Sequence, residues 1–200
     1  MALNKSRGNM HDWCTHMHTH LGGECPHQCI YCSTTDIGRR FRIEKYTGPL
    51  RLIEKELRVN YGKGKTIFIE HCSDLFAASI PEYFINRIID HCLQYPENTY
   101  VFQTKNPARY PTSGIETFPK DSIFGCTIET NRDIPGISKA PRPRERAEAM
   151  VNIPGRKFVT IEPVLDFDVD ILASWIAEIR PEFLNLGADS KGHGLPERTV

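Results

Sequence analysis

The chain has 200 residues, of which 40% are hydrophobic, and its 25 Lys and Arg balance its 25 Asp and Glu. This size and this hydrophobic fraction exclude a disordered chain and suit one domain with a single core. Zero net charge excludes bulk electrostatic attraction to nucleic acid, but it leaves room for a local basic patch. We therefore expect residues 1–200 to form one domain.

The chain has no apolar run as long as a membrane span, and its first residues lack the apolar core of a signal peptide. We therefore expect a cytoplasmic protein with no membrane partner. Cysteines stay reduced in that compartment, so the seven cysteines of this chain favour metal or redox chemistry over disulfide bonds.

The first predicted strand lies within residues 11–21, after a polar segment, residues 1–10, that we expect to be a mobile leader. Side chains alternate in character along it, which is typical of a strand, and Gly22 and Gly23 then allow a turn. The side chains on one side are Cys14, His16, His18 and His20. The three histidines form either a metal-binding face or a set of partly buried strand residues.

A cysteine loop follows directly, with Cys25, Cys29 and Cys32 in a Cys-x3-Cys-x2-Cys spacing. Closely spaced thiolates bind soft or borderline metals, and one loop can wrap a single metal centre. Three cysteines are one ligand short of a saturated four-ligand site. The loop therefore predicts a metal centre with an open position or a fourth ligand from elsewhere.

Apolar strand patterns then alternate with amphipathic helix patterns to the end of the chain. We predict strands over residues 66–69, 100–103, 122–128, 157–161 and 183–186. We predict helices over residues 50–59, 81–93, 144–151 and 169–179, and the helix between residues 107 and 120 is the least defined. With the first strand this makes about six βα units, which require a parallel sheet with right-handed crossovers.

Polar residues follow these strands, at the edge where α/β barrels and open α/β sheets bind ligands. They are Glu70, Ser73, Asp74, Thr104, Lys105, Thr127, Glu129 and Glu162. The chain contains neither GxGxxG nor GxxxxGK[ST], so dinucleotide-binding and P-loop sites are disfavoured.

The cysteine loop resembles the signature of the radical S-adenosylmethionine (radical SAM) superfamily, and Tyr31 matches the aromatic residue that usually precedes the third cysteine. Segments 73–76, 104–107 and 161–165 are further similar to a phage and prophage subgroup without an assigned reaction. The chain departs from that subgroup at Cys14 and Ser33. The resemblance implies a partial TIM-type (βα)6 barrel with the cluster loop after the first strand, and a further helix after residue 190.

In that superfamily three cysteines hold a [4Fe-4S] cluster, and S-adenosylmethionine binds the fourth iron. The resemblance therefore implies that Cys25, Cys29 and Cys32 are the metal ligands, and that an external donor of the flavodoxin or ferredoxin type supplies an electron. Cleavage of S-adenosylmethionine to a 5′-deoxyadenosyl radical is then followed by hydrogen abstraction from the substrate, for which we consider a nucleotide or nucleic acid. The cofactor-binding candidates are Tyr31, Glu70, Ser73, Asp74, Thr104, Lys105, Thr127, Glu129 and Glu162.

Each candidate also has a plain structural interpretation. Glu70, Ser73 and Asp74 occupy the position of the family's Gly-Gly-Glu-like segment without its glycines, and such residues also form solvated loops or helix caps. Lys105 can equally be a solvated strand end. Glu162, beside an apolar strand, is expected to be buried and to need a partner such as Arg146.

The catalytic candidates are Glu162 and two cysteines, Cys72 and Cys126, because cysteines donate hydrogen atoms in some radical SAM enzymes. An isolated cysteine is more often a small buried hydrophobe. Two other functions remain open. One is a glycyl-radical-activating enzyme, and the other is a non-catalytic zinc-stabilised binding protein in which His20 or His27 completes a Cys3His site.

Overall fold

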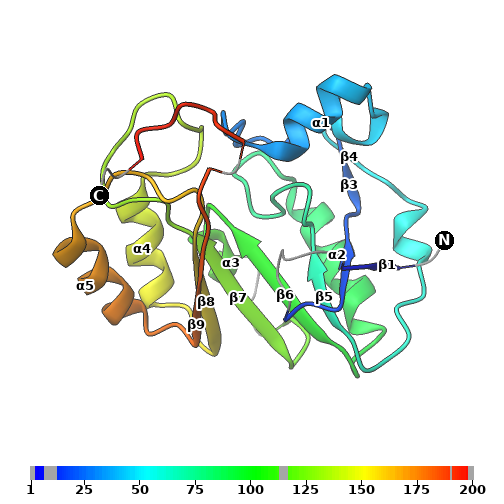
Figure 1. The fold of residues 1–200 in the computed structure, drawn as a ribbon. Coiled ribbons are helices and arrows are strands. Elements are labelled where there is room, and N and C mark those ends of the chain that lie inside the picture. The colour runs from blue at the N-terminus through cyan, green and yellow to red at the C-terminus, as the bar shows by residue number, and fades with distance from the viewer. Residues whose placement is uncertain (1–2, 7–12, 113–116, 190, 198–200) are drawn as a thin grey trace.

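A computed structural model describes residues 3–6, 13–112, 117–189 and 191–197 (Figure 1). Its main sheet has seven strands in the order β1-β2-β5-β6-β7-β8-β9, and every pair from β2 to β9 is parallel. The bounds are β1 (Asn4–Lys5), β2 (His16–His18), β5 (Thr66–Ile69), β6 (Thr99–Thr104), β7 (Ser122–Thr127), β8 (Arg156–Ile161) and β9 (Phe183–Leu186). Six parallel strands in sequential order confirm the predicted α/β class and the partial barrel.

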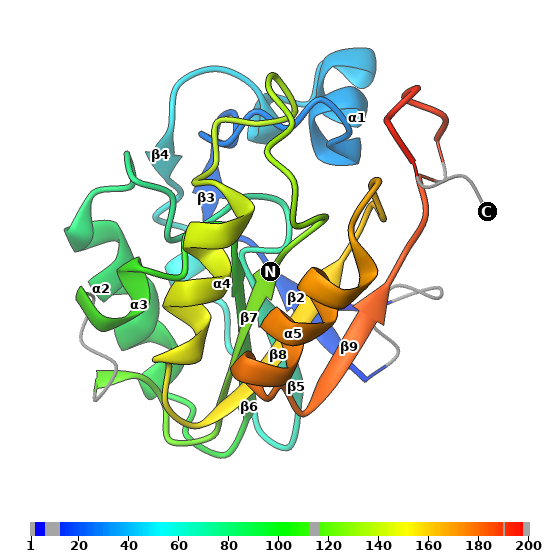
Figure 2. The ribbon, with the colours of Figure 1, turned by 90° about the vertical axis from the view of Figure 1, so that its left-hand side faces the viewer.

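The helices that connect these strands lie along one face of the sheet, as Figures 1 and 2 show from two directions. They are α2 (Glu82–Leu93), α3 (Arg109–Thr112), α4 (Pro143–Val151) and α5 (Val169–Ile179). In α2 the buried side chains recur at helical spacing, and Pro81 precedes its first turn. The predicted helices over residues 81–93, 144–151 and 169–179 are confirmed. Each buries one side, and in α4 that side contains Arg146 as well as Ala147 and Met150.

The two faces of the sheet carry different cores. The larger core lies between the sheet and the helices, whereas a small apolar cluster on the inner face contains Phe68, Val101 and Phe158. Phe158 lies across Gly125 of β7, where an added Cβ would come within 2.1 Å of the Phe158 ring. The sheet therefore buries apolar side chains on both of its faces.

The segment between β2 and β5 differs from its prediction. Residues 50–59 form strand β4 (Arg51–Leu52), which pairs with β3 (Leu21–Gly22), and a short 3-10 helix, η2 (Glu56–Arg58). Apolar residues such as Leu52 and Val59 still pack on the core, but from an extended path that the Ile53 N–H bond to His20 O (2.9 Å) helps to hold. The predicted helix 50–59 is therefore wrong, because apolar spacing over ten residues fits both paths.

Helix α1 (Ser33–Phe41) was not predicted at all. Its two large apolar side chains, Ile37 and Phe41, are both exposed, and the buried residue in it is Gly38. A helix without a buried apolar stripe leaves no helical periodicity in the sequence. A second short 3-10 helix, η1 (Glu44–Tyr46), follows it, and both lie beyond the carboxyl ends of the parallel strands (Figure 1).

The first strand is shorter than predicted. Of the predicted range 11–21, residues 11 and 12 lie outside the described residues, and regular pairing covers His16–His18 and Leu21–Gly22. In the leader, Asn4–Lys5 pairs with β2 as an antiparallel edge strand, and residues 1–2 and 7–10 lie outside the described part of the chain. No helix among the described residues has the length and hydropathy needed to cross a membrane.

Candidate cofactor and substrate site

A cavity of about 440 Å³ opens at the carboxyl ends of the parallel strands. This volume is within the range of small-molecule sites. Eleven of the twelve sequence-predicted cysteine-ligand and cofactor-binding residues line it: Cys25, Cys29, Tyr31, Cys32, Glu70, Ser73, Asp74, Thr104, Lys105, Thr127 and Glu162. The strand ends and the cysteine loop therefore meet in one place.

The cysteine loop, residues 25–32, forms one wall of the cavity and leads directly into α1. Two backbone hydrogen bonds join it to the loop that precedes α4: Lys139 N–H donates to His27 O (2.7 Å), and Ile30 N–H donates to Ile137 O (3.0 Å). The loop is therefore held by a segment more than a hundred residues away in the sequence.

Burial controls the thiols of the loop. It raises the pKa of Cys25 to about 12, and Asp74 and the neighbouring thiols Cys29 and Cys32 add to that rise. The pKa of Cys29 is also raised, chiefly by burial, while Lys105 opposes the shift. The mutual influence of these thiols reflects their closeness, and metal binding to such buried thiols releases protons.

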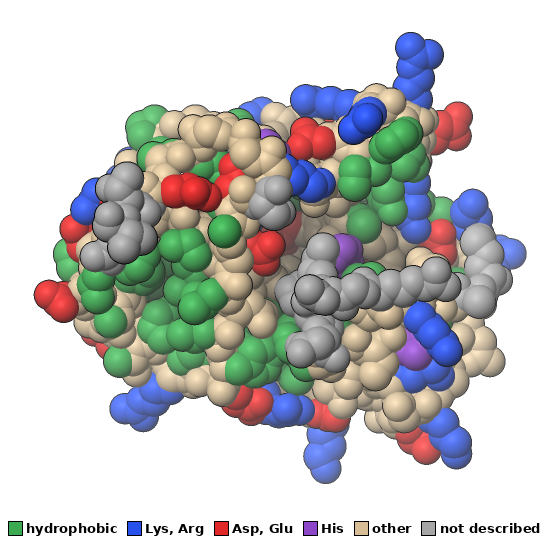
Figure 3. Space-filling view, in the orientation of Figure 1, with side chains coloured by type: hydrophobic (Ala, Val, Ile, Leu, Met, Phe, Trp, Pro, Cys, Tyr) green, Lys and Arg blue, Asp and Glu red, His purple; other side chains and the backbone are tan. Residues whose placement is uncertain are grey.

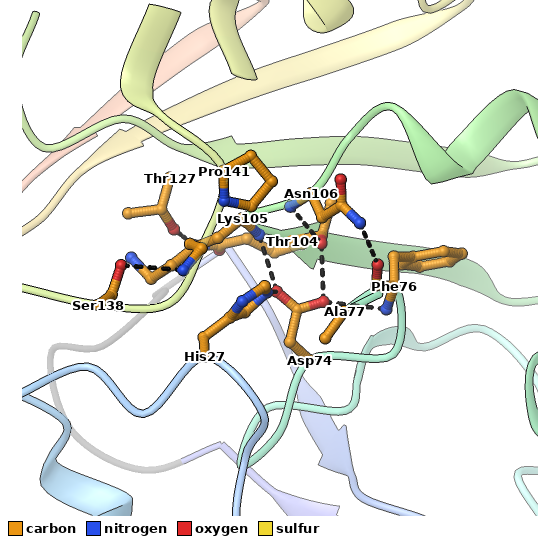
Figure 4. Close-up of polar contacts among 12 residues, drawn as sticks. His27, Asp74, Phe76, Ala77, Thr104, Lys105, Asn106, Thr127, Ser138 and Pro141 are labelled. Atoms are coloured by element: carbon orange, nitrogen blue, oxygen red, sulfur yellow. Dashed lines mark hydrogen bonds and ion pairs between the residues drawn. The ribbon is translucent and has the colours of Figure 1, made fainter. Parts of the chain in front are cut away.

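Asp74 connects the cysteine loop to the sheet (Figure 4). Its carboxylate lies 2.8 Å from His27 Nε2 and accepts hydrogen bonds from the Thr104 hydroxyl (2.7 Å) and the Lys105 N–H (2.7 Å). The Phe76 N–H donates to it as well, at 2.9 Å. Burial alone would raise the pKa of Asp74, but His27 and these donors outweigh it and lower the pKa. Asp74 therefore remains charged and holds His27 against the ends of β5 and β6.

A second charged cluster lies beside the loop, around Glu129. Its carboxylate accepts hydrogen bonds from the Tyr31 hydroxyl and the Lys105 ammonium, and Arg146 Nη1 lies 2.7 Å from its other oxygen. Lys105 Nζ also lies 2.8 Å from the Tyr31 hydroxyl and 5.1 Å from the centre of the Tyr31 ring. Glu129 itself is absent from the cavity wall but fixes two residues that belong to it.

The balance of charge around Glu129 favours its ionised form. Burial alone would raise the pKa of Glu129, but Lys105 and Arg146 lower it to about 2. Arg146, which we considered as one candidate partner of Glu162, pairs with Glu129 instead. Glu162 is exposed and lies at the cavity mouth, so its predicted burial is wrong. Its side chain packs over Gly187, whose missing Cβ leaves the space.

Glu70 belongs to a buried polar network as well as to the cavity wall. His91 Nε2 lies 2.9 Å from Val59 O, and His91 Nδ1 lies 3.0 Å from His20 Nε2. The Tyr61 hydroxyl lies 2.9 Å from the same His20 nitrogen, and His20 Nδ1 lies 2.7 Å from Glu70 Oε1. Burial raises the pKa of Glu70 to about 7, against the backbone N–H groups that it accepts from.

Of the three alternating histidines, His18 and His20 are buried and His16 is partly exposed. His18 lies 3.5 Å from Glu56, and the rings of His18 and His20 are 4.4 Å apart. Within the described part of the chain no group of three His, Cys, Asp or Glu side chains is arranged to hold a metal ion. The buried-strand interpretation therefore describes His18 and His20.

That geometry also bears on the kind of metal centre that the cysteine loop suits. A structural zinc site needs four donors at about 2.0–2.3 Å from one ion. An iron–sulfur cluster is held by thiolates on its separate irons. The three thiols of the loop are soft donors that either kind of centre uses, and all three lie on the cavity wall.

Two buried polar atoms of the cavity wall have no hydrogen-bond partner within the described chain: Ser73 Oγ and Gln103 Oε1. The amide nitrogen of Gln103 donates to Thr127 Oγ1 at 2.7 Å, so its oxygen is left for a ligand. Buried polar groups are normally paired, so these atoms fit a polar cofactor or substrate. The chemistry of the wall thus matches a small polar ligand beside three thiols.

The two cysteine candidates differ in access. Cys72 is partly exposed on the cavity wall, and its sulfur lies 3.6 Å from the Tyr46 hydroxyl. Cys126 is buried in the core of the sheet, where burial raises its pKa to about 12. Cys72 therefore is accessible from the cavity, whereas Cys126 packs in the core as a small buried hydrophobic residue.

Sequence reasoning missed three residues that line the cavity: Gln103, Asp189 and His193. His27, which also lines it, was considered only as a zinc ligand. His193 joins the C-terminal segment to α1, with Nδ1 2.6 Å from Asp189 and Nε2 3.1 Å from Asp36. The position of Gln103, directly before Thr104 at a strand end, could have identified it. The contact of His193 with Asp36 joins residues 157 positions apart, and no sequence pattern predicts it.

The DUF5131 family model, described as a protein of unknown function, matches residues 6–178. No curated protein matches the chain. None of these comparisons addresses the phage and prophage subgroup, which stays a prediction.

Solved structures of spore photoproduct lyase share the fold. A double mutant with bound AdoMet and dinucleoside spore photoproduct has a TM-score of 0.66 and 10% identity, covering 96% of this chain and 63% of that one. A complex with dinucleoside spore photoproduct has a TM-score of 0.61 and 13% identity, covering 87% and 54%. The chain thus spans less than two thirds of the length of these structures, and the likeness is one of fold.

Proposed function

We propose that this chain, which belongs to the DUF5131 family, is a radical SAM enzyme. The observation that carries the proposal is the position of Cys25, Cys29 and Cys32 on the wall of the cavity at the carboxyl ends of a partial barrel. Similarity of fold to spore photoproduct lyase, one structure of which has bound AdoMet, supports it. The external electron donor of flavodoxin or ferredoxin type remains part of this proposal.

In this proposal the three thiolates hold a [4Fe-4S] cluster. With S-adenosylmethionine bound, the cluster supplies a one-electron reductive cleavage that yields methionine and, once a hydrogen atom is taken from the substrate, 5′-deoxyadenosine. The residues of the protein would bind and orient the cofactor and the substrate and would exclude water from the cavity.

Residues of the wall divide that work. Lys105 offers its ammonium to the carboxylate of the cofactor, while Glu129 and Tyr31 hold it in position. Ser73 and Gln103 offer unpaired polar atoms to the remaining polar groups. Asp74 keeps the cysteine loop against the sheet through His27.

For the substrate we propose a nucleotide-containing molecule. Its support is the similar fold of spore photoproduct lyase, which has been solved with a bound dinucleoside spore photoproduct. The glycyl-radical-activating alternative uses the same cleavage chemistry on a protein substrate and stays a prediction.

Anaerobic reconstitution with iron and sulfide tests the proposal. We expect about four irons and four sulfides per chain with charge-transfer absorbance. Dithionite and S-adenosylmethionine should then yield 5′-deoxyadenosine, measured by liquid chromatography. One bound zinc with no iron would support the zinc-stabilised alternative and overturn ours.

Labelling of Cys72 tests the cavity separately from turnover. Outside the cysteine loop, Cys14, Cys92 and Cys126 are buried, so we expect a small alkylating reagent to modify Cys72 first. S-Adenosylmethionine should slow this reaction of the cluster-loaded protein about tenfold or more when it fills the cavity. Mass spectrometry of the peptides measures both, with S-adenosylmethionine-free protein as the control. Equal rates with and without the cofactor would remove Cys72 from the site.

A further inference from the structure

Helix α1 presents an unusual surface beside the cavity, which we call the α1 surface and define as Ile37, Arg39, Arg40, Phe41 and Arg42. Phe41 is 64% exposed and Ile37 is 41% exposed, and Ile37 also lines the cavity. Figure 3 shows basic and hydrophobic side chains together over α1, beside the hollow of this face. The surface therefore begins at the cavity mouth.

The three arginines of the α1 surface are exposed, and no acidic side chain among the described residues forms an ion pair with them. Two exposed arginines elsewhere are paired, Arg87 with Glu54 and Arg144 with Glu148, whereas Arg58 and Arg180 are single exposed arginines without an ion pair among the described residues. The nearest acidic residue within the helix, Asp36, lies against His193. A chain of zero net charge thus concentrates unpaired positive charge at one place.

Aromatic and basic groups alternate on this surface. The Arg40 guanidinium lies 5.4 Å from the centre of the Phe41 ring, so one side chain offers a flat apolar face and its neighbours offer charge. Exposed aromatic rings interleaved with arginines bind single-stranded nucleic acids, in which bases stack and phosphates are neutralised. An acidic protein partner would use the charges but has less need of an exposed ring.

The cavity limits what enters. A cavity of about 440 Å³ is too small to enclose a polymer. Enzymes that act on a base within a strand take that nucleotide into a pocket, and the rest of the strand stays at the surface. We infer that the α1 surface binds the phosphate backbone of a nucleic-acid strand that presents one nucleotide to the cavity, an inference that rests on the proposed function. It makes the substrate a nucleotide within a strand.

Binding of short fluorescein-labelled single-stranded DNA and RNA to the reconstituted protein, followed by anisotropy at several salt concentrations, tests this inference. We expect the triple variant R39A/R40A/R42A to bind about tenfold or more weakly, and the slope of log K against log salt to fall by about two. The matched control is R87A/R144A/R156A, which removes the same number of positive charges from exposed arginines elsewhere. It should bind the strands as tightly as the unsubstituted protein.

The ring has its own control. Phe41→Ala should weaken binding about tenfold through lost stacking, whereas Tyr83→Ala, at a ring that is 60% exposed on α2, should have no effect. Equal losses in both triple variants would mean bulk charge alone and would overturn the inference. Unchanged binding of the strands by R39A/R40A/R42A would also overturn the inference. If that variant instead were no longer reduced by an acidic flavodoxin, the α1 surface would bind the electron donor and not a strand.

The two proposals fail separately. Strand binding needs neither reductant nor S-adenosylmethionine, and cluster content and 5′-deoxyadenosine formation are measured with dithionite in the same variants. Loss of the inferred binding with normal cleavage leaves the proposed function standing. If the protein binds strands through the α1 surface but assembles no cluster, the inference about the surface holds and the proposed function fails.

Discussion

Cys29→Ala is expected to abolish both cluster assembly and 5′-deoxyadenosine formation. Cys29 is the second of the three thiols in the sequence, is buried, and lines the cavity. Its removal leaves two thiolates for a cluster that needs three from the protein, and an open iron for S-adenosylmethionine then no longer exists. Iron and sulfide analysis after reconstitution, followed by chromatography of the cleavage products, measures both losses.

Cys126→Ala is the matched control for that variant. It removes one buried thiol from the sheet core, away from the cavity wall, and should keep the full iron content. Its expected cost is a modest loss of stability, about 1 kcal/mol from a small cavity. A Cys29→Ala protein with undiminished cleavage would refute the assignment of the loop as the ligand set.

Glu129→Ala is expected to destabilise the fold by about 3–5 kcal/mol, because it leaves the buried guanidinium of Arg146 without its partner. Lys105 and Tyr31 lose the acceptor that holds them at the same time. Chemical denaturation followed by circular dichroism measures the change. Glu148→Ala removes an exposed carboxylate from Arg144 and should cost at most about 1 kcal/mol. Similar losses in the two variants would contradict a buried structural role for Glu129.

The same carboxylate sets a pH dependence. Lys105 and Arg146, against the opposing effect of burial, lower the pKa of Glu129 to about 2 from its ordinary value of 4.5. Between these values the unfolded chain binds more protons than the folded chain, so stability falls as the pH falls. The stabilisation is complete above about pH 5 and is lost toward pH 2. Glu129→Gln should remove this part of the acid sensitivity.

The sheet was predictable because its strands are continuous apolar runs that end in polar residues. Strands β5 and β9 match the predicted ranges residue for residue, and the prediction for β6 differs by one residue at each end. Strands β5 and β6 are buried on both faces, so burial is recorded in nearly every residue. In β9 half-buried and exposed residues alternate, and its short apolar run alone identified it. Convergence of Ser73, Lys105 and Thr127 at one cavity then followed from parallel topology alone.

The errors have a common physical origin. Helix α1 buries no apolar stripe, and residues 50–59 carry one that an extended path also buries. The partners of Glu129 and Asp74 are decided by packing between distant segments, so the sequence contained no pattern that assigned Arg146 to Glu129 or His27 to Asp74. The spacing of apolar residues in the sequence indicates which side of one helix or strand is buried. It does not indicate which other segment that side contacts.

The attachment of the cysteine loop has a thermodynamic consequence. His27 lies against Asp74 and receives the Lys139 N–H, so contacts within the protein alone define the path of residues 25–32. Ordering a segment of this length costs on the order of 10 kcal/mol in backbone entropy. Because folding meets that cost, the affinity of the loop for the proposed cluster would not be reduced by it. On that proposal, a loop that had lost its cluster would keep the shape needed to bind another.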